Sequence, residues 1–175
     1  MDLKASIRAI PDHPKPGIVF RDLTTLMGNP EAFAHTCGAM AEAFKSRGVT
    51  HVAGIEARGF IFGAAVADRL GCAFVPVRKA GKLPSETLRR SYALEYGEDT
   101  LEIHKDALPA GAKVLLLDDL LATGGTARAT AELIREAGGE VLSAAFVVEL
   151  EGLPGRAKLE ELSLDVWSLT QFKED

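Results

Sequence analysis

Short apolar runs alternate with amphipathic segments along most of this chain. The runs have the length of strands buried on both faces, and they lie at 52–55, 73–77, 113–117 and 141–148. The segments between them repeat apolar residues at helical spacing and end near glycine, and they lie at 30–47, 60–70 and 126–137. Strands that alternate with helices in this way predict an α/β fold, with a central parallel sheet flanked by helices.

The remaining segments give weaker signals. Leu3, Ile7 and Ile10 have helical spacing, and prolines between positions 11 and 16 prevent the helix from continuing, so we expect a short N-terminal helix and then an extended arm. After a polar segment, strand-like stretches at 92–96 and 101–103 flank a turn at 97–99. We expect a flexible hairpin flap over 81–97, because few large apolar residues would anchor it. A helix at 157–162 and an edge strand at 166–169 complete the prediction.

Composition and charge restrict the class of protein. The 175 residues fit one domain, and 47% hydrophobic and 26% charged residues are typical of a globular chain. Twenty Lys and Arg against 25 Asp and Glu give a net charge of −5, which provides no general attraction to nucleic acid or to an anionic membrane. Cys37 and Cys72 show no disulfide or metal spacing, and no apolar run has the length of a membrane helix, so we expect a cytoplasmic protein.

The segment at 114–127, VLLLDDLLATGGTA, carries the most specific chemistry. A strand ending in Asp118 and Asp119 precedes a Gly/Thr loop that opens a helix, so backbone N–H groups there would converge on one phosphate. The Walker and GxGxxG spacings are absent. The two carboxylates would repel a bare phosphate, which favours sugar hydroxyls or a hydrated Mg²⁺ as their partners. The segment therefore indicates a ribose-phosphate site; the alternative is a turn cap and a generic loop.

Basic residues occupy two other loops that are expected at the same edge of the sheet. Arg58 follows the run at 52–55, and Gly59 beside it permits a close backbone approach. A second group comprises Arg78, Lys79, Lys82, Arg89 and Arg90. Such a local excess in an acidic protein points to a polyanionic ligand, and the alternative is a solvated loop or a weak nucleic-acid patch.

The segment at 114–127 resembles the phosphoribosyl-pyrophosphate signature of the type I phosphoribosyltransferases. Four further blocks are similar, in order, to those of adenine phosphoribosyltransferases: PGIVFRD at 16–22, EARGF at 56–60, RKAGKLP at 78–84 and SYALEYG at 91–97. The resemblance implies a single type I phosphoribosyltransferase domain over 1–175. In it, 1–28 would form the N-terminal helix and base-binding arm or hood, and 81–97 the catalytic flap.

The reaction implied by this resemblance is purine salvage. The enzyme would transfer the 5-phosphoribosyl group from 5-phosphoribosyl 1-pyrophosphate to adenine, giving AMP and pyrophosphate. Mg²⁺ would be held mainly by the substrate and water, near Asp118 and Asp119, without direct protein ligands. A cytoplasmic homodimer is expected, with no nucleic-acid or membrane partner.

The resemblance also implies roles for individual residues. Phe20 would stack on adenine, while the Val19 carbonyl and the Arg21 N–H would meet its edge. The catalytic residues would be Glu95, Arg58, Asp118 and Asp119. The other residues implied in substrate binding are Ala57, Lys79, Lys82, Tyr96, Ala122, Thr123, Gly124, Gly125 and Thr126. Arg89 and Arg90 receive no role, and a cis peptide is expected between Glu56 and Ala57.

Two other functions remain open at this point. The first is a phosphoribosyltransferase for a 6-oxopurine, which would share the phosphate chemistry and differ in the base. The second is a non-catalytic regulator that binds ribose phosphate. Repressors of that kind carry a basic DNA-binding extension, and this N-terminus has neither the length nor the charge for one.

Overall fold

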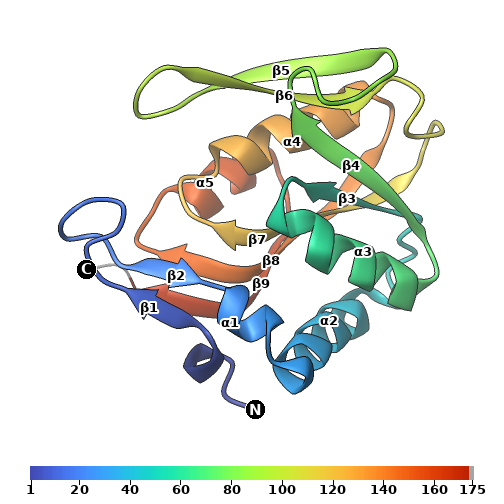
Figure 1. The fold of residues 1–175 in the computed structure, drawn as a ribbon. Coiled ribbons are helices and arrows are strands. Elements are labelled where there is room, and N and C mark those ends of the chain that lie inside the picture. The colour runs from blue at the N-terminus through green and yellow to red at the C-terminus, as the bar shows by residue number, and fades with distance from the viewer. Residues whose placement is uncertain (174–175) are drawn as a thin grey trace.

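The computed structural model describes residues 1–173, and a seven-stranded sheet forms its centre (Figure 1). The strand order is β5-β6-β4-β3-β7-β8-β9. Neighbouring strands run parallel from β4 through β3, β7 and β8 to β9, whereas β6 is antiparallel to both β4 and β5. The strands are β3 (His51–Ile55), β4 (Ala73–Lys79), β5 (Thr87–Ala93), β6 (Glu98–His104), β7 (Lys113–Leu121), β8 (Glu140–Glu151) and β9 (Val166–Lys173). The expected α/β fold with a central parallel sheet is confirmed.

Helices cover both faces of this sheet (Figure 1). They are α1 (Thr24–Met27), α2 (Pro30–Phe44), α3 (Arg58–Leu70), α4 (Gly125–Glu136) and α5 (Gly155–Glu160). Asn29 caps α2 by accepting hydrogen bonds from the N–H groups of Glu31 and Ala32, each at 3.1 Å. Gly71 ends α3 in the left-handed conformation, with φ at +66°. The helices expected after residue 28 are therefore present, although α2 ends at Phe44 and not at residue 47, and α3 and α5 each begin two residues earlier than expected.

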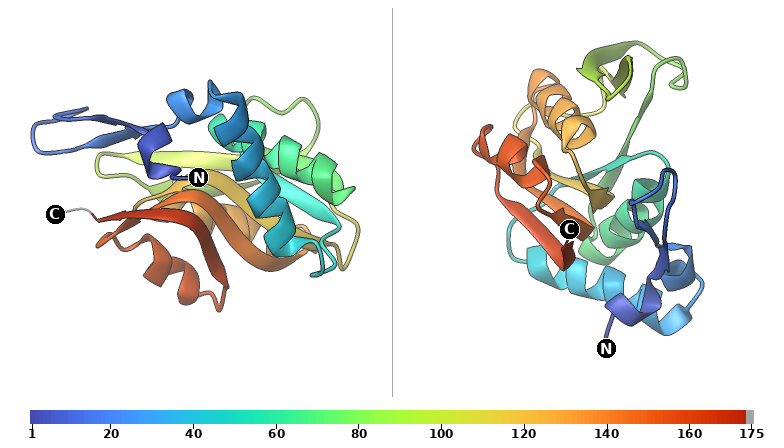
Figure 2. Two further views of the ribbon diagram at one scale, coloured as in Figure 1. Left: turned by 90° about the horizontal axis from the view of Figure 1, so that it is seen from below. Right: turned by 90° about the vertical axis from the view of Figure 1, so that its left-hand side faces the viewer.

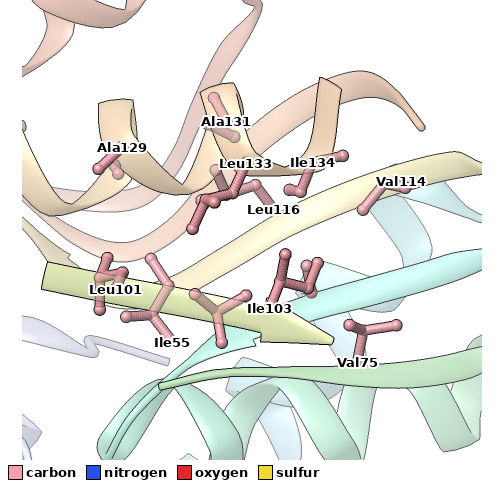
Figure 3. Close-up of a cluster of buried hydrophobic side chains, with 14 of the residues drawn as sticks. Ile55, Val75, Leu101, Ile103, Val114, Leu116, Ala129, Ala131, Leu133 and Ile134 are labelled. Carbon is pink, nitrogen blue, oxygen red and sulfur yellow. The ribbon is translucent and has the colours of Figure 1, made fainter. Parts of the chain in front are cut away.

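The hydrophobic core has two parts, one on each face of the sheet. The part beneath α4 includes Ile55, Val75, Leu101 and Leu133 (Figure 3), while the other part lies beneath α2 and α3. Strand β7 serves both parts: Val114 and Leu116 pack in the first, and Leu115 and Leu117 pack in the second. Because successive side chains point to opposite faces, a strand buried on both faces needs the continuous apolar run seen in the sequence.

The N-terminus differs from the helix that its spacing predicts. Only Lys4–Ser6 form a helical turn, a 3-10 helix, and Arg8–Ile10 form the strand β1. Strand β1 pairs antiparallel with β2 (Phe20–Asp22), and the hairpin extends away from the sheet in the left view of Figure 2. Leu3 and Ile7 are buried as an amphipathic helix would bury them, but so short a helix is costly to nucleate. Pairing with β2 instead supplies backbone hydrogen bonds.

Strand boundaries near the expected flap also differ. The outer flap strand is Thr87–Ala93, most of which was expected to be irregular, and Ala93 pairs with Glu98. The turn therefore comprises 94–97 and not 97–99, so Glu95 lies in a turn. Strand β7 continues to Leu121, which places Asp118 and Asp119 within the strand and not at its end.

Within residues 1–173, no helix is long and apolar enough to cross a membrane.

Candidate active site

A large cavity lies where β3 and β7 reach their carboxyl ends, the edge at which parallel sheets bind ligands. Its volume is about 560 Å³. Besides the β5–β6 hairpin, three chain segments meet there: the segment after β3 brings Ala57 and Arg58, the end of β4 brings Lys79, and β7 with the start of α4 brings Asp118, Asp119 and Thr126. The structure thus brings together six residues that the sequence assigns to the site.

The acidic pair forms the floor of this cavity. The Asp119 side chain is buried and accepts a hydrogen bond from Nε of Arg58, while Asp118 Oδ1 accepts the Asp119 backbone N–H at 2.9 Å. Burial, followed by the charge of Asp119, raises the pKa of Asp118 well above its ordinary value. Burial is the largest single influence on the pKa of Arg58 and acts to lower it, but the Asp119 hydrogen bond and the charges of the nearby acids together raise this pKa above its ordinary value. The floor therefore places the positively charged Arg58 guanidinium beside the carboxyl groups of Asp118 and Asp119.

Close backbone packing sets the position of this floor. The first turn of α3 lies directly on β7, and a Cβ added at Gly59 would lie 2.7 Å from Oδ1 of Asp118. Any side chain at position 59 would therefore push α3, and Arg58 with it, away from the two acids. The Glu56–Ala57 peptide that precedes α3 is cis, as the resemblance predicted.

A smaller cavity of about 110 Å³ opens beside the acidic pair. Its lining includes all five residues of the predicted phosphate loop, Ala122, Thr123, Gly124, Gly125 and Thr126. Gly124 precedes α4 with φ at +82°, a conformation that side chains disfavour. The loop therefore presents the amino end of α4, with its unpaired N–H groups, to a pocket of roughly the size of one phosphate group.

The two predicted lysines are held by different acids. Lys79 lines the large cavity, and its Nζ lies 3.0 Å from Oδ2 of Asp99 on β6, which raises the pKa of Lys79. Lys82 lies outside the lining, and its Nζ is 2.6 Å from Oε2 of Glu56. Burial acts to raise the pKa of Glu56, yet the hydrogen bonds from Lys82 and from the Lys79 N–H hold it below its usual value.

The predicted base-binding arm lies beside the large cavity's lining and not within it. Val19 precedes β2, and Phe20 within β2 is half-buried with its ring edge-on to His13 at 5.2 Å. The guanidinium of Arg21 lies 4.2 Å from the ring centre of Phe172. The three residues are therefore placed by the β1–β2 hairpin and by its contact with β9.

The predicted catalytic Glu95 is also outside the lining. It lies in the turn between β5 and β6, where its Oε2 is 3.6 Å from Nζ of Lys15 in the arm, and the same Nζ lies 5.2 Å from the ring centre of Tyr96. The tips of the arm and the flap are thus in contact, although they lie far apart in the sequence. Tyr96 is exposed on the surface.

Several lining residues were missed by the sequence interpretation. Glu56, Tyr92 and Asp99 all line the large cavity, together with apolar residues of β3 and β6. Glu56 is the first residue of the EARGF block, so its position near Arg58 in the sequence could have identified it as a site residue. Tyr92 and Asp99 are cross-strand partners in the flap, a relation that appears only once the hairpin register is known.

Arg89 and Arg90, which received no predicted role, form ion pairs on the flap. Nη2 of Arg89 lies 3.1 Å from Oε1 of Glu102 on the neighbouring strand. Nη2 of Arg90 lies 3.1 Å from Oε2 of Glu136 on α4. Arg90 therefore ties the flap to α4, while Arg89 stays within the hairpin.

Comparison with known proteins agrees with this site. A family model described as a phosphoribosyl transferase domain matches residues 23–172. The chain is thus a member of the phosphoribosyltransferases. A relative from Serratia proteamaculans named adenine phosphoribosyltransferase is 59% identical over 170 residues, which cover 97% of this chain and 86% of that protein. The chain belongs to the adenine phosphoribosyltransferase family, as its sequence blocks indicated.

Solved structures show the same likeness. The adenine phosphoribosyltransferase of Thermoanaerobacter pseudethanolicus has a TM-score of 0.93 and 51% identity, with 98% of each chain covered. That of Saccharomyces cerevisiae, solved with an imino-altritol bisphosphate and adenine, has a TM-score of 0.90 and 42% identity, with 96% of each chain covered. The type I phosphoribosyltransferase fold predicted from the sequence is confirmed.

Proposed function

We propose that this chain is an enzyme that transfers the 5-phosphoribosyl group of 5-phosphoribosyl 1-pyrophosphate to adenine, forming AMP and pyrophosphate in purine salvage. The observation that carries the proposal is a pair of cavities that share Asp118 and Thr126, one lined by the phosphate loop and the other by the acidic pair and basic residues, in a chain of this family. These three groups match the three parts of the donor: its 5′-phosphate, its ribose hydroxyls and its pyrophosphate.

The 5′-phosphate is bound at the loop 122–126. Backbone N–H groups at the start of α4 point their positive ends at the small cavity, and the Thr126 hydroxyl adds one more donor there. These donors lie at a fixed helix end, so they need little rearrangement when the phosphate arrives. The loop therefore serves as the anchor against which the rest of the donor is aligned.

Asp118 and Asp119 accept hydrogen bonds from the ribose hydroxyls beside this anchor. Asp119 already holds Arg58, whose guanidinium has further N–H groups for the pyrophosphate. Ala57 and Lys79 line the same cavity. Lys82 lies outside its lining and forms an ion pair with Glu56, which does line it. As the C1′ bond breaks, these cations stabilise the charge that builds on the leaving pyrophosphate.

The acidic pair also fits the Mg²⁺ ion that the family implies. In the part of the chain that the structure describes, no group of three or more His, Cys, Asp or Glu could hold a metal ion. Two adjacent carboxylates suit an ion that keeps its waters and takes most of its ligands from substrate phosphates. Such an ion would be held mainly by the substrate and its waters, with Asp118 and Asp119 close by and not ligating it directly, and when bound it would supply positive charge to the pyrophosphate.

Adenine is bound by the arm and covered by the flap. Phe20 provides an aromatic face, and the Val19 carbonyl and the Arg21 N–H provide an acceptor and a donor for the base edge. A 6-oxopurine would present its carbonyl to the Val19 carbonyl, which leaves polar groups unpaired. The flap, 81–97, brings Glu95 to a ring nitrogen of the base, with Tyr96 beside it, and excludes water while the bond forms. The contact of Lys15 with Glu95 and Tyr96 supports this pairing of arm and flap.

Three further features belong to this proposal. Residues 1–175 act as one catalytic domain, in which 1–28 serve as the arm. The enzyme works in the cytoplasm, where its free thiols, Cys37 and Cys72, remain reduced. It assembles as a homodimer, which sedimentation of the purified protein tests directly.

An activity assay tests the proposal. The protein is incubated with 5-phosphoribosyl 1-pyrophosphate, Mg²⁺ and adenine, hypoxanthine, guanine or xanthine, and nucleotide and pyrophosphate are measured together. AMP and pyrophosphate should form in equal amounts with adenine, with little product from the other bases. Preference for a 6-oxopurine would move the assignment to that base, while donor binding without turnover on any base would identify a regulator.

A further inference from the structure

Ala122 and Gly124, in the first part of the phosphate loop 122–126, lie against α5, a short helix to which no role was predicted. A Cβ added at Gly124 would lie 2.8 Å from the Cα and 2.9 Å from the carbonyl oxygen of Gly155, the first residue of α5. A Cβ added at Gly155 would lie 2.9 Å from Cγ of Leu121 and would press on the carbonyl oxygen of Ala122. The two backbones therefore touch, and neither leaves room for a side chain.

An ion pair between the half-buried Arg156 and the buried Glu149 fixes the start of α5 in this position. The guanidinium of Arg156 donates from Nε and Nη2 to the two carboxylate oxygens of Glu149 on β8, at 2.7 and 2.6 Å. Its Nη1 donates to the Val166 carbonyl at 3.0 Å. Only 5% of Glu149 is exposed, and it also accepts from Oγ of Ser168 at 2.8 Å and from Nε2 of Gln171 at 3.2 Å.

The geometry of this pair is more specific than core packing requires. A bidentate guanidinium–carboxylate pair defines both distance and orientation, because two parallel hydrogen bonds must form together. Arg156 is the residue next to Gly155. An ion pair that holds Arg156 in one orientation therefore also holds the Gly155 backbone, which touches the loop. Burying the Glu149 carboxylate is costly, and its pair with the half-buried Arg156 offsets that cost without a large gain in stability, so the position of the pair beside the phosphate loop is the feature to explain.

We infer that Glu149, Gly155 and Arg156 are positioning residues for the 5′-phosphate: the ion pair holds Gly155 as a rigid backing that keeps the loop 122–124 in its binding conformation. The inference rests on the proposed function of that loop. None of the three residues lines either cavity of the site, so they act through the loop and not on the substrate.

The direct test is Gly155→Ala, with Gly38→Ala as its matched control. Gly38 lies within α2, away from the site, and an added Cβ there meets only the flexible end of Arg69, at 3.2 Å. Gly155→Ala should raise the KM for 5-phosphoribosyl 1-pyrophosphate about tenfold or more, the loss expected when one charge-assisted hydrogen bond is weakened. The KM for adenine should change less than about twofold, and the control should match the wild type.

A second variant, Glu149→Gln, tests the ion pair, because glutamine has nearly the same shape as glutamate and lacks its charge. It should raise the donor KM in the same direction, and Arg156→Lys should do the same because lysine cannot make the bidentate pair. Thermal melts and circular dichroism identify how much of each variant is folded. A merely structural role would lower the melting temperature and the amount of active enzyme while both KM values stay normal, and that result would overturn the inference.

Binding of ribose 5-phosphate, measured by calorimetry, separates this inference from the proposed function. If the wild type binds ribose 5-phosphate and Gly155→Ala binds it at least about tenfold more weakly, the positioning role stands even where no AMP is formed. If the wild type forms AMP and Gly155→Ala binds ribose 5-phosphate equally well, the function stands and the positioning role is wrong.

Discussion

Asp118→Asn should make the ligand-free protein more stable at neutral pH while it removes activity. Asn keeps the shape of the side chain and its Oδ1, which can still accept the Asp119 N–H. It loses only the charge, which burial and the neighbouring Asp119 carboxylate oppose. The charged Asp118 carboxylate therefore lowers the free energy of unfolding of the ligand-free protein, and replacing it by Asn should restore that free energy.

The magnitude and sign follow from the raised pKa of Asp118. An aspartate in the unfolded chain ionises near pH 4, so above that pH the folded protein binds one more proton than the unfolded chain does, until the pH reaches the raised pKa. Across that window the wild type loses about 1.4 kcal/mol of unfolding free energy per pH unit at this site. The variant lacks the group, so its advantage should be absent near pH 4, grow as the pH rises, and level off above the raised pKa.

Urea unfolding of both proteins between about pH 4 and pH 8 measures this difference, because the groups that do not contact Asp118 titrate alike in the two chains. Asp165→Asn serves as a matched control of opposite sign, since a hydrogen bond from Arg47 at 3.0 Å lowers the pKa of Asp165. That exposed pair should stabilise the wild type by at most about 1 kcal/mol near neutral pH, and the benefit should vanish in acid. A difference between the wild type and Asp118→Asn that does not vary with pH, or a variant less stable at pH 7, would refute the reasoning.

Three further variants test the roles proposed at the site. Thr126→Val should weaken binding of 5-phosphoribosyl 1-pyrophosphate about tenfold to a hundredfold, since one hydrogen bond to a charged phosphate is lost; unchanged affinity by calorimetry would contradict the phosphate loop. Arg58→Ala should lower kcat/KM for the donor at least about a hundredfold in initial-rate assays while adenine affinity stays near normal, and equal losses for both substrates would remove it from the pyrophosphate side. Glu95→Gln should lower kcat about a hundredfold with both KM values little changed, and a kcat within about twofold of the wild type would exclude Glu95 from proton handling.

Much of the scaffold could be predicted from the sequence because its signals are local. The apolar run at 113–117 is continuous because β7 packs on both faces. Burial of both faces requires apolar residues at consecutive positions, so a short stretch of sequence is enough to detect it. Asn29 and Gly71 mark helix ends through their own side chain or backbone freedom. The phosphate loop was equally readable, because a Gly-rich turn between a strand and a helix creates its anion site from adjacent backbone groups.

Tertiary structure decided what depends on partners distant in the chain. Asp118 and Asp119 resemble a strand end, yet β7 continues to Leu121 because β8 pairs with it as far as Glu149. The contact of Lys15 with Glu95, and that of Gly124 with Gly155, each join segments that nothing in their own sequence connects. Residue type and spacing specify local conformation. Hydrogen-bond register and close backbone packing depend on two segments that are distant in the chain, so they are determined only when those segments pack together in the folded protein.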